Sequence, residues 1–176
     1  MSDNFNAPGS SRPSAASAPS AAPQQFITFK LDTAEYGVDI MAVREIKGWS
    51  ETTAIPNSPR FISGVINLRG IIVPIMDLRA RFGMEPVQPT SMHVVIIINT
   101  GQRTTGLLVD AVSDIISVAP DAIRAIPDMG VDTREKLLAG LVPLPDRMVS
   151  LVSLDFVIGV GDGRPVACTD TILSAA

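Results

Sequence analysis

Few side chains in this chain could carry out catalysis, and they do not form a set. His93 is the only histidine, so a Ser-His-Asp or Cys-His site would have to use it. It opens the apolar run HVVIII, where a role at a strand edge or as a cap is the simpler interpretation. Asp77 and Asp110 are isolated carboxylates, each better explained by a turn or a helix cap. We therefore predict that the chain is not an enzyme.

Metal and cofactor sites have equally little support. Cys168 is the only cysteine, so it cannot form an intramolecular disulfide, and a zinc site would have to take most of its ligands from carboxylates. The nearest basic residue to Cys168 is Arg164, so nothing close lowers the pKa of the thiol. Residues 159–163 (GVGDG) superficially resemble a phosphate-binding loop but lack its Lys-Ser/Thr pair and following helix. We predict no cofactor and no metal.

Composition limits the partners. The chain has 176 residues, 46% of them hydrophobic, which is enough for one domain with a sizeable core. Its net charge of −4 and pI near 4.9 argue against nucleic acid or anionic lipid as a partner, because both attract clustered Lys and Arg. Apolar runs such as Val94–Ile98 are far shorter than the roughly 20 residues that span a bilayer. We therefore expect a cytoplasmic protein with no direct membrane insertion.

A polar turn between two apolar runs is the best candidate for binding. In GVINLRGIIVPIMDL, residues 64–78, the sequence Asn67-Leu68-Arg69-Gly70 separates two strand-like runs. One interpretation is that Asn67 and Gly70 supply left-handed turn geometry and that Arg69 is a solvated turn residue. The other makes Arg69 an interface anchor, since Arg is enriched among interface hot spots. Its apolar neighbours favour the second.

An internal repeat predicts the architecture. Residues 26–46 align without a gap on residues 95–115, so that Gly37 meets Gly106 and Ile46 meets Ile115. A second match places Gly64-Val65 on Gly140-Leu141 and residues 75–78 on 151–154. Short alternating strands joined by tight turns are typical of small all-β barrels. We predict an all-β protein with two similar barrel subdomains that share a core.

The two copies diverge at the polar turn. The positions of Asn67-Leu68-Arg69-Gly70 are taken in the second copy by Pro143-Leu144-Pro145-Asp146. A barrel of this kind therefore closes without an arginine there, which favours a role for Arg69 beyond the scaffold.

The domain boundaries follow from changes in composition along the chain. Residues 1–24 are rich in Ala, Pro and Ser and show no hydrophobic period, so we predict a disordered tail. The folded domain is expected at 25–158, with subdomains at about 25–90 and 91–158 and possible exchange of strands or helices. Residues 159–176 are expected to be an irregular tail. The helices expected are short, at 41–47, 78–82 and 133–139.

Three segments carry a family resemblance: EYGVDIMAVREIKGW, IPNSPRFISGVINLRGIIVPIMDL and GLLVDAVSDI. They closely resemble the CheW family of bacterial chemotaxis coupling proteins, over a match from about Gln25 to Phe156. The resemblance implies two five-stranded SH3-like barrels packed side by side. It also implies a non-enzymatic adaptor that joins the cytoplasmic tip of a chemoreceptor to the regulatory domain of the histidine kinase CheA, recruited to membrane-associated receptor arrays. We expect the isolated chain to be a monomer.

The resemblance also assigns a receptor-facing surface. Val43 and Glu45 are expected in a short helix, and an apolar groove is expected to be floored by Val43, Leu68, Val94 and Val95, with Glu45 and Arg69 at its rim. The alternatives are core packing for Val43 and a solvated helix face for Glu45. Leu144 and Met148 are candidates for kinase contact. The full set of expected interface residues is Val43, Glu45, Gly64, Asn67, Leu68, Arg69, Val94 and Val95.

Other functions remain to be weighed against the adaptor. They are a fragment of the CheA regulatory domain itself, a CheV-type hybrid, a small enzyme on a barrel scaffold, and a CheW-like scaffold in a pathway that controls pili or gene expression. Neither dimerisation nor ATP-binding segments nor a receiver domain can be recognised in the sequence, which disfavours the first two.

Overall fold

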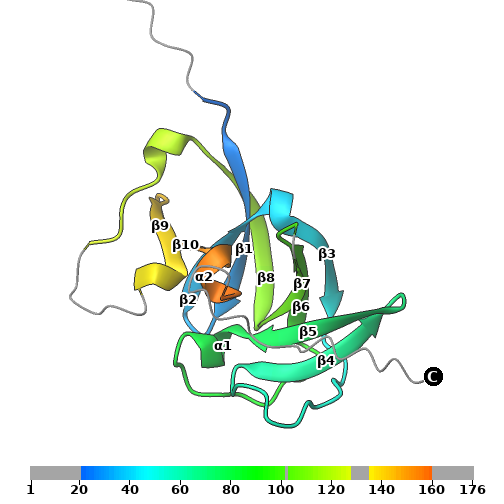
Figure 1. Ribbon diagram of the computed structural model, residues 1–176. Helices are drawn as coiled ribbons and strands as arrows, with labels where there is room; N and C mark the ends of the chain where they lie inside the picture. Colours follow the sequence, from blue (N-terminus) through cyan, green and yellow to red (C-terminus); the bar gives the residue numbers. More distant parts are fainter. Residues whose placement is uncertain (1–20, 102, 128–134, 160–176) are drawn as a thin grey trace, which may run out of the picture.

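The computed structural model describes residues 21–101, 103–127 and 135–159. Within them, ten strands form two five-stranded sheets (Figure 1). The sheet that we call barrel 1 contains, in spatial order, β3 (Val43–Gly48), β6 (Val94–Asn99), β7 (Thr104–Val109), β5 (Ile71–Asp77) and β4 (Ile62–Leu68). Barrel 2 contains β8 (Ala111–Val118), β1 (Gln24–Leu31), β2 (Ala34–Asp39), β10 (Met148–Val152) and β9 (Leu138–Pro143). The predicted mainly-β class is confirmed.

The two barrels exchange a hairpin. The hairpin β1–β2 belongs to the first copy of the repeat but lies in barrel 2, and the matching hairpin β6–β7 of the second copy lies in barrel 1. The strand orders of the two barrels correspond position by position when the repeat is applied. A boundary at about residue 90 therefore separates copies of the repeat and not barrels, and each barrel needs strands from both copies.

Three apolar clusters hold this arrangement together. One fills barrel 1 and includes Val95 and Ile97, and one fills barrel 2 and includes Phe26 and Val149. The third, which we call the central core, takes side chains such as Ile27 and Ile96 from both barrels. Successive side chains of β6 thus face different clusters, which explains why the run HVVIII is apolar without alternation. The predicted shared core is confirmed.

The glycines that the repeat aligns are needed for close packing. Gly106 on β7 pairs with Ile75 on the parallel strand β5, and Gly37 on β2 pairs with Leu151 on β10 in the same way. A Cβ on Gly106 would lie 2.4 Å from Ile75 Cδ1 and 2.8 Å from Val95 Cγ1. A Cβ on Gly37 would lie 3.0 Å from Leu151 Cδ2. Both barrels therefore leave little room for a side chain at this position, and barrel 1 leaves the least.

The expected helices are only partly present. Helix α1 (Leu78–Arg81) is confirmed, and its repeat partner α2 (Leu154–Val157) follows β10. The helix expected at 41–47 is wrong: a 3-10 turn at Ile40–Ala42 leads directly into strand β3. Burial along β3 alternates with period two, and its pairing with β6 stabilises the extended form. Of the helix expected at 133–139, the described part contains a 3-10 turn at Glu135–Leu137.

Helix α1 also links the two halves of the fold. Arg81 on α1 donates hydrogen bonds to the main-chain oxygens of Val157 (3.1 Å) and Phe156 (2.8 Å) on α2. Its guanidinium lies 4.8 Å from the ring centroid of Phe61. A residue of barrel 1 therefore donates to carbonyl groups at the end of α2, of which that of Phe156 also accepts from the Gly159 N–H at 3.3 Å.

Replacing Gly106 by Ala should destabilise the fold by about 1–3 kcal/mol, because three core side chains must move to admit one methyl group. Urea denaturation followed by circular dichroism measures the change. The matched control is Gly48→Ala, because a Cβ on Gly48 meets nothing within 4 Å. Equal effects of the two substitutions would contradict the packing argument.

Candidate interaction surface

The turn between β4 and β5 holds Arg69 in a fixed and unusual conformation. Arg69 and Gly70 both have positive φ, at 53° and 88°, as in the two-residue type I′ turns that suit the twist of a hairpin. Asn67 lies in β4, and its Oδ1 accepts a hydrogen bond from the Gly70 N–H at 2.8 Å. The expectation that Asn67 itself supplies the left-handed geometry is wrong. Arg69 takes that role while its side chain remains exposed.

Arg69 pairs with Glu45. Its Nη2 lies 2.8 Å from Glu45 Oε2, and the two side chains are 75% and 23% exposed. Glu45 lies on strand β3, so the expected helix position is wrong, but the two residues named for this surface do meet. β3 and β4 are the two edge strands of barrel 1. The ion pair therefore connects edge strand β3 to the β4–β5 hairpin at the opposite edge of the sheet. At this exposure it contributes no more than about 1 kcal/mol to stability.

Barrel 2 is built without such a pair. The repeat places Asp114 at the position of Glu45 and Pro145 at the position of Arg69. Asp114 Oδ1 accepts a hydrogen bond from the main-chain N–H of Ile115 at 2.7 Å, and the main chain of Asp114 bonds the buried hydroxyl of Thr28. Asp114 is thus engaged by hydrogen bonds and not by an ion pair in barrel 2, and at these aligned positions the Arg69–Glu45 pair is specific to barrel 1.

The end of each barrel beside the β4–β5 turn or its repeat equivalent, which we call the mouth, also differs between the two barrels. In barrel 1 a shallow hollow opens beside the turn, and Ile71 and Ile72 next to it are 50% and 62% exposed. In barrel 2 the residue that aligns with Ile71 is Arg147, whose Nε lies 3.0 Å from Glu35 Oε2. By the repeat, this ion pair stands in barrel 2 where barrel 1 presents the apolar Ile71. The hollow is lined by Arg44, Leu68, Arg69, Ile71, Val73 and Thr104.

A second set of apolar side chains borders the central core that the barrels share. Val43 on β3 and Val94 on β6 are half-buried against the central core. Ile46 pairs across β3 and β6 with Ile96, and Ile115 pairs across β8 and β1 with Ile27. Because paired residues point to the same side of a sheet, Ile46 and Ile115 face the central core from its rim. They are 44% and 51% exposed, and we call Val43, Val94, Ile46 and Ile115 the inter-barrel face.

The sequence prediction missed half of this face. Ile46 and Ile115 align with each other in the repeat, and this shared isoleucine is a signal that becomes informative once both side chains are known to be exposed.

Two of the expected interface residues are not available to a partner. Val95 is 2% exposed and lies inside barrel 1 with the half-buried Leu68 packed against the same cluster. Val43 and Val94 contact the central core instead, so the expected single groove floored by all four residues is wrong. Gly64 is buried with φ at 141°, and a Cβ there would lie 2.5 Å from the Thr53 carbonyl oxygen. Its requirement is structural.

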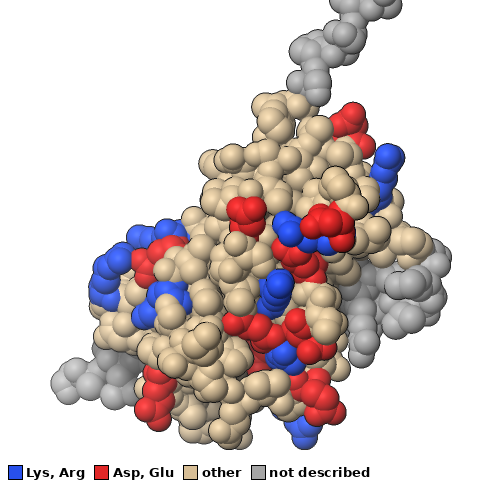
Figure 2. Space-filling model, turned by 180° about the vertical axis from the view of Figure 1, so that it is seen from behind, with Lys and Arg blue, Asp and Glu red and all other residues tan. Residues whose placement is uncertain are grey.

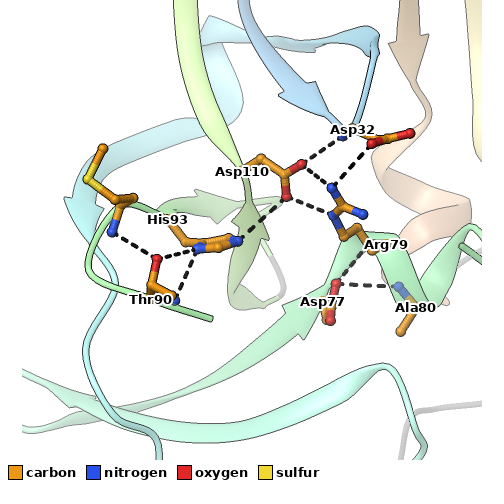
Figure 3. Close-up of polar contacts among 8 residues, drawn as sticks. Asp32, Asp77, Arg79, Ala80, Thr90, His93 and Asp110 are labelled. Carbon is orange, nitrogen blue, oxygen red and sulfur yellow. Dashed lines mark hydrogen bonds and ion pairs between the residues drawn. The ribbon is translucent and has the colours of Figure 1, made fainter. Parts of the chain in front are cut away.

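A polar cluster joins the barrels near the base of this face (Figure 3). Arg79 Nε donates to Asp110 Oδ1 at 2.8 Å, and Arg79 Nη2 donates to Asp110 Oδ2. The side chains of Arg79 and Asp110 are only 15% and 22% exposed. The view of Asp110 as an isolated carboxylate is therefore wrong, whereas Asp77 does cap α1, with its Oδ1 accepting from the N–H of Arg79 at 2.8 Å.

His93 completes the cluster as a structural residue. Its Nδ1 accepts a hydrogen bond from the Thr90 N–H at 3.0 Å, and its Nε2 lies 3.8 Å from Asp110 Oδ1. The Arg79 guanidinium holds the pKa of Asp110 below its ordinary value, with burial acting in the opposite direction. The same hydrogen bond raises the pKa of Arg79. Asp110 and Arg79 are therefore both charged at neutral pH.

Charge is mixed on the face of the molecule seen in Figure 2. Acidic and basic side chains are interspersed there, separated by broad areas without charge. Among the described residues, no group of three or more His, Cys, Asp or Glu side chains could hold a metal ion. The helices in the described part of the chain are all too short to cross a bilayer.

Comparison with known proteins decides the family. The model of the CheW-like domain matches residues 25–160. The chain belongs to the CheW family. The chemotaxis protein CheW of Klebsiella aerogenes is 46% identical over 132 residues, which cover 75% of this chain and 80% of that protein. The probable chemotaxis protein CheW of Rhizobium etli is 43% identical, with 75% and 85% covered.

A solved structure agrees with the fold. The scaffolding protein TtCheW from Thermoanaerobacter tengcongensis superimposes with a TM-score of 0.72 at 32% sequence identity, covering 77% of this chain and 92% of that one. A relative with another name, protein FrzA of Myxococcus xanthus, is 30% identical over 136 residues, with 76% of this chain and 82% of that protein covered. The predicted family and the predicted pair of five-stranded subdomains are confirmed, and the family is one of chemotaxis adaptors and not of enzymes.

Replacing Asp110 by Asn should lower the free energy of unfolding by about 1–3 kcal/mol at neutral pH, since a mostly buried charged hydrogen bond is lost. Because the folded pKa of Asp110 is depressed, its contribution is complete above the unfolded value of about 3.9 and is lost as pH falls through the folded value. The difference between wild type and variant should therefore shrink below about pH 4. Urea denaturation at several pH values measures it.

The control for the change in net charge is Glu51→Gln, because Glu51 is exposed. A difference between Asp110→Asn and wild type that stays constant from pH 7 to pH 3 would show that the ionised carboxylate is not what stabilises the junction.

Proposed function

We propose that this chain couples the cytoplasmic tip of a chemoreceptor to the regulatory domain of the kinase CheA, and that the receptor binds the inter-barrel face. The observation that carries the proposal is the pair of exposed isoleucines, Ile46 and Ile115, at the rim of the central core. A helical hairpin presents apolar side chains at helical spacing and can lay them along such a face. The half-buried Val43 and Val94 would form its floor.

The ion pair of barrel 1 borders this face. Glu45 lies on β3 between Val43 and Ile46, on the opposite side of the strand from both by its pairing with Ile97. Polar residues at the rim of an apolar contact orient the partner more than they add affinity. We assign Arg69 and Glu45 this role. The divergence between the two copies supports it, because barrel 2 closes without the pair.

Kinase contact is proposed for the ends of the barrels. Met148 at the start of β10 is 55% exposed, whereas Leu144 is half-buried against the interior of barrel 2. Of these two candidates Met148 is therefore the better placed to meet a partner. Because this surface and the inter-barrel face use different residues, one chain can bind two partners at once, as an adaptor must. A monomer in the cytoplasm, recruited to receptor arrays, fits this role.

Replacing Arg69 by Glu should leave the fold intact and abolish most receptor-dependent control of the kinase. The substitution places two like charges at the position of an exposed ion pair, so the effect on unfolding should stay within about 1 kcal/mol. The measurement is CheA autophosphorylation with a receptor cytoplasmic fragment, with and without this protein. Arg124→Glu is the matched control, because Arg124 is exposed and lies in the other half of the chain.

Normal kinase control by Arg69→Glu would remove the turn from the interface. A large loss of thermal stability in the same variant would instead make Arg69 a structural residue.

Replacing Ile115 by Glu should weaken binding of the receptor fragment at least about tenfold, because an apolar contact of this size is worth more than 1.4 kcal/mol. Isothermal titration calorimetry measures the dissociation constant. Val87→Glu is the control, since Val87 is 43% exposed, close to the 51% of Ile115, but lies outside the face. Equal affinities for the two variants would place the receptor elsewhere.

A further inference from the structure

Asp110 alone forms one of the two crossings of the described chain between the barrels. It lies between β7 of barrel 1 and β8 of barrel 2. Its main-chain N–H donates to the Lys30 carbonyl oxygen at 3.1 Å, which fixes the crossing against β1. Any rotation of one barrel relative to the other would therefore change the surroundings of its carboxylate.

That carboxylate is bonded from both sides. Arg79 reaches it from α1, which follows β5 of barrel 1, through a two-point hydrogen-bonded ion pair. The main-chain N–H of Asp32, in the turn between β1 and β2 of barrel 2, donates to Asp110 Oδ2 at 2.7 Å. Arg79 Nη2 also lies 3.9 Å from Asp32 Oδ1. Figure 3 shows these groups converging on one carboxylate, so Asp110 connects α1 of barrel 1 to a turn of barrel 2.

The crossing leads directly to the inter-barrel face. Asp110 is followed by β8, which carries Ile115, and His93 beside the carboxylate is followed by Val94 at the start of β6. Val94 pairs with Val109, the residue before Asp110. Ile115 and Val94 therefore lie on strands, β8 and β6, that begin next to Asp110 and His93.

The other crossing between the barrels has no such connection. It runs from β2 to β3 through Ile40–Ala42, and the repeat aligns Asp110 with Met41, whose side chain is 87% exposed. The repeat also aligns Arg79 with Asp155, so this crossing has neither the carboxylate nor the guanidinium of the pair. Strand β3 is held by its pairing with β6, and it carries Glu45 of the exposed Arg69–Glu45 pair. Among the described residues, the crossing at Asp110 is therefore the one that has a mostly buried ion pair between the barrels.

We propose that Arg79 and Asp110 are positioning residues which fix the relative orientation of the two barrels and so hold the inter-barrel face in the shape that its partner binds. A two-point guanidinium–carboxylate pair defines direction as well as distance. Without this ion pair, the inter-barrel face adopts a range of widths. A partner that binds only one width selects the molecules that have it, so its apparent affinity falls in proportion to the fraction of molecules with that width. The inference rests on the proposed function only for the identity of the partner.

The test compares Asp110→Asn and Arg79→Lys with wild type in two ways. Residual dipolar couplings of the two barrels report their relative orientation, and methyl spectra report Ile46 and Ile115 against Ile75 and Ile97 inside barrel 1. Calorimetry with the receptor cytoplasmic fragment reports affinity. We expect the orientation and the signals of Ile46 and Ile115 to change, those of Ile75 and Ile97 to stay, and affinity to fall about 5- to 20-fold.

The matched control is Arg147→Gln, which removes the ion pair with Glu35 inside barrel 2 and should cost stability without altering orientation or affinity. Folded Asp110→Asn and Arg79→Lys with wild-type orientation and affinity would overturn the proposal and leave the pair a stabiliser only. If Asp110→Asn fails to fold, Arg79→Lys, which keeps the charge but loses the two-point geometry, decides by the same readouts. Wild type that does not bind the fragment would contradict the proposed function, while the orientation measurement would still decide on the pair.

Discussion

The fold depends on one constraint: neither barrel can be completed by a continuous stretch of chain. The hairpin β1–β2 closes the barrel built mainly from the second copy of the repeat, and β6–β7 closes the other. The side chains that face inward from both hairpins then form the central core. Burial of this core is the main favourable free energy, and it is gained only when both barrels are present. The barrels should therefore fold as one cooperative unit, and the face between them is a product of that coupling.

Much of this could be predicted from the sequence. The aligned glycines Gly37 and Gly106 marked a real packing requirement, since each faces a large apolar side chain on a parallel neighbouring strand. The exchange of hairpins could only be left open as a possibility. The hairpins of the two copies have the same pattern of apolar residues, so the sequence does not show which barrel each hairpin joins. The helix expected at 41–47 failed because its residues suit more than one backbone, and pairing with β6 decides between them.

The candidate surface was predicted less completely. Arg69 and Glu45 are expected together at the rim of one groove, but their ion pair could not be predicted, because the two residues are brought into contact only by closure of barrel 1. Arg79 and Asp110 lie 31 residues apart, and neither spacing nor composition connects them. Val95 was misassigned because a strand buried on both faces hides which of its residues point outward. The alignment of Ile115 with Ile46 was a usable signal, but it became informative only with the exposed fractions of the two side chains.

Both what the two copies share and what distinguishes them guide the assignment of function, and the assignment can be tested directly. The ion pairs Arg69–Glu45 and Arg79–Asp110 and the open mouth of barrel 1 lack counterparts in the matching half, whereas the exposed isoleucines are kept in both. The most direct measurement is a methyl NMR titration of the labelled protein with a receptor cytoplasmic fragment. The account predicts that the largest changes occur at Val43, Ile46, Val94 and Ile115. Changes confined to Ile71, Ile72 and Met148 at the barrel ends would contradict it.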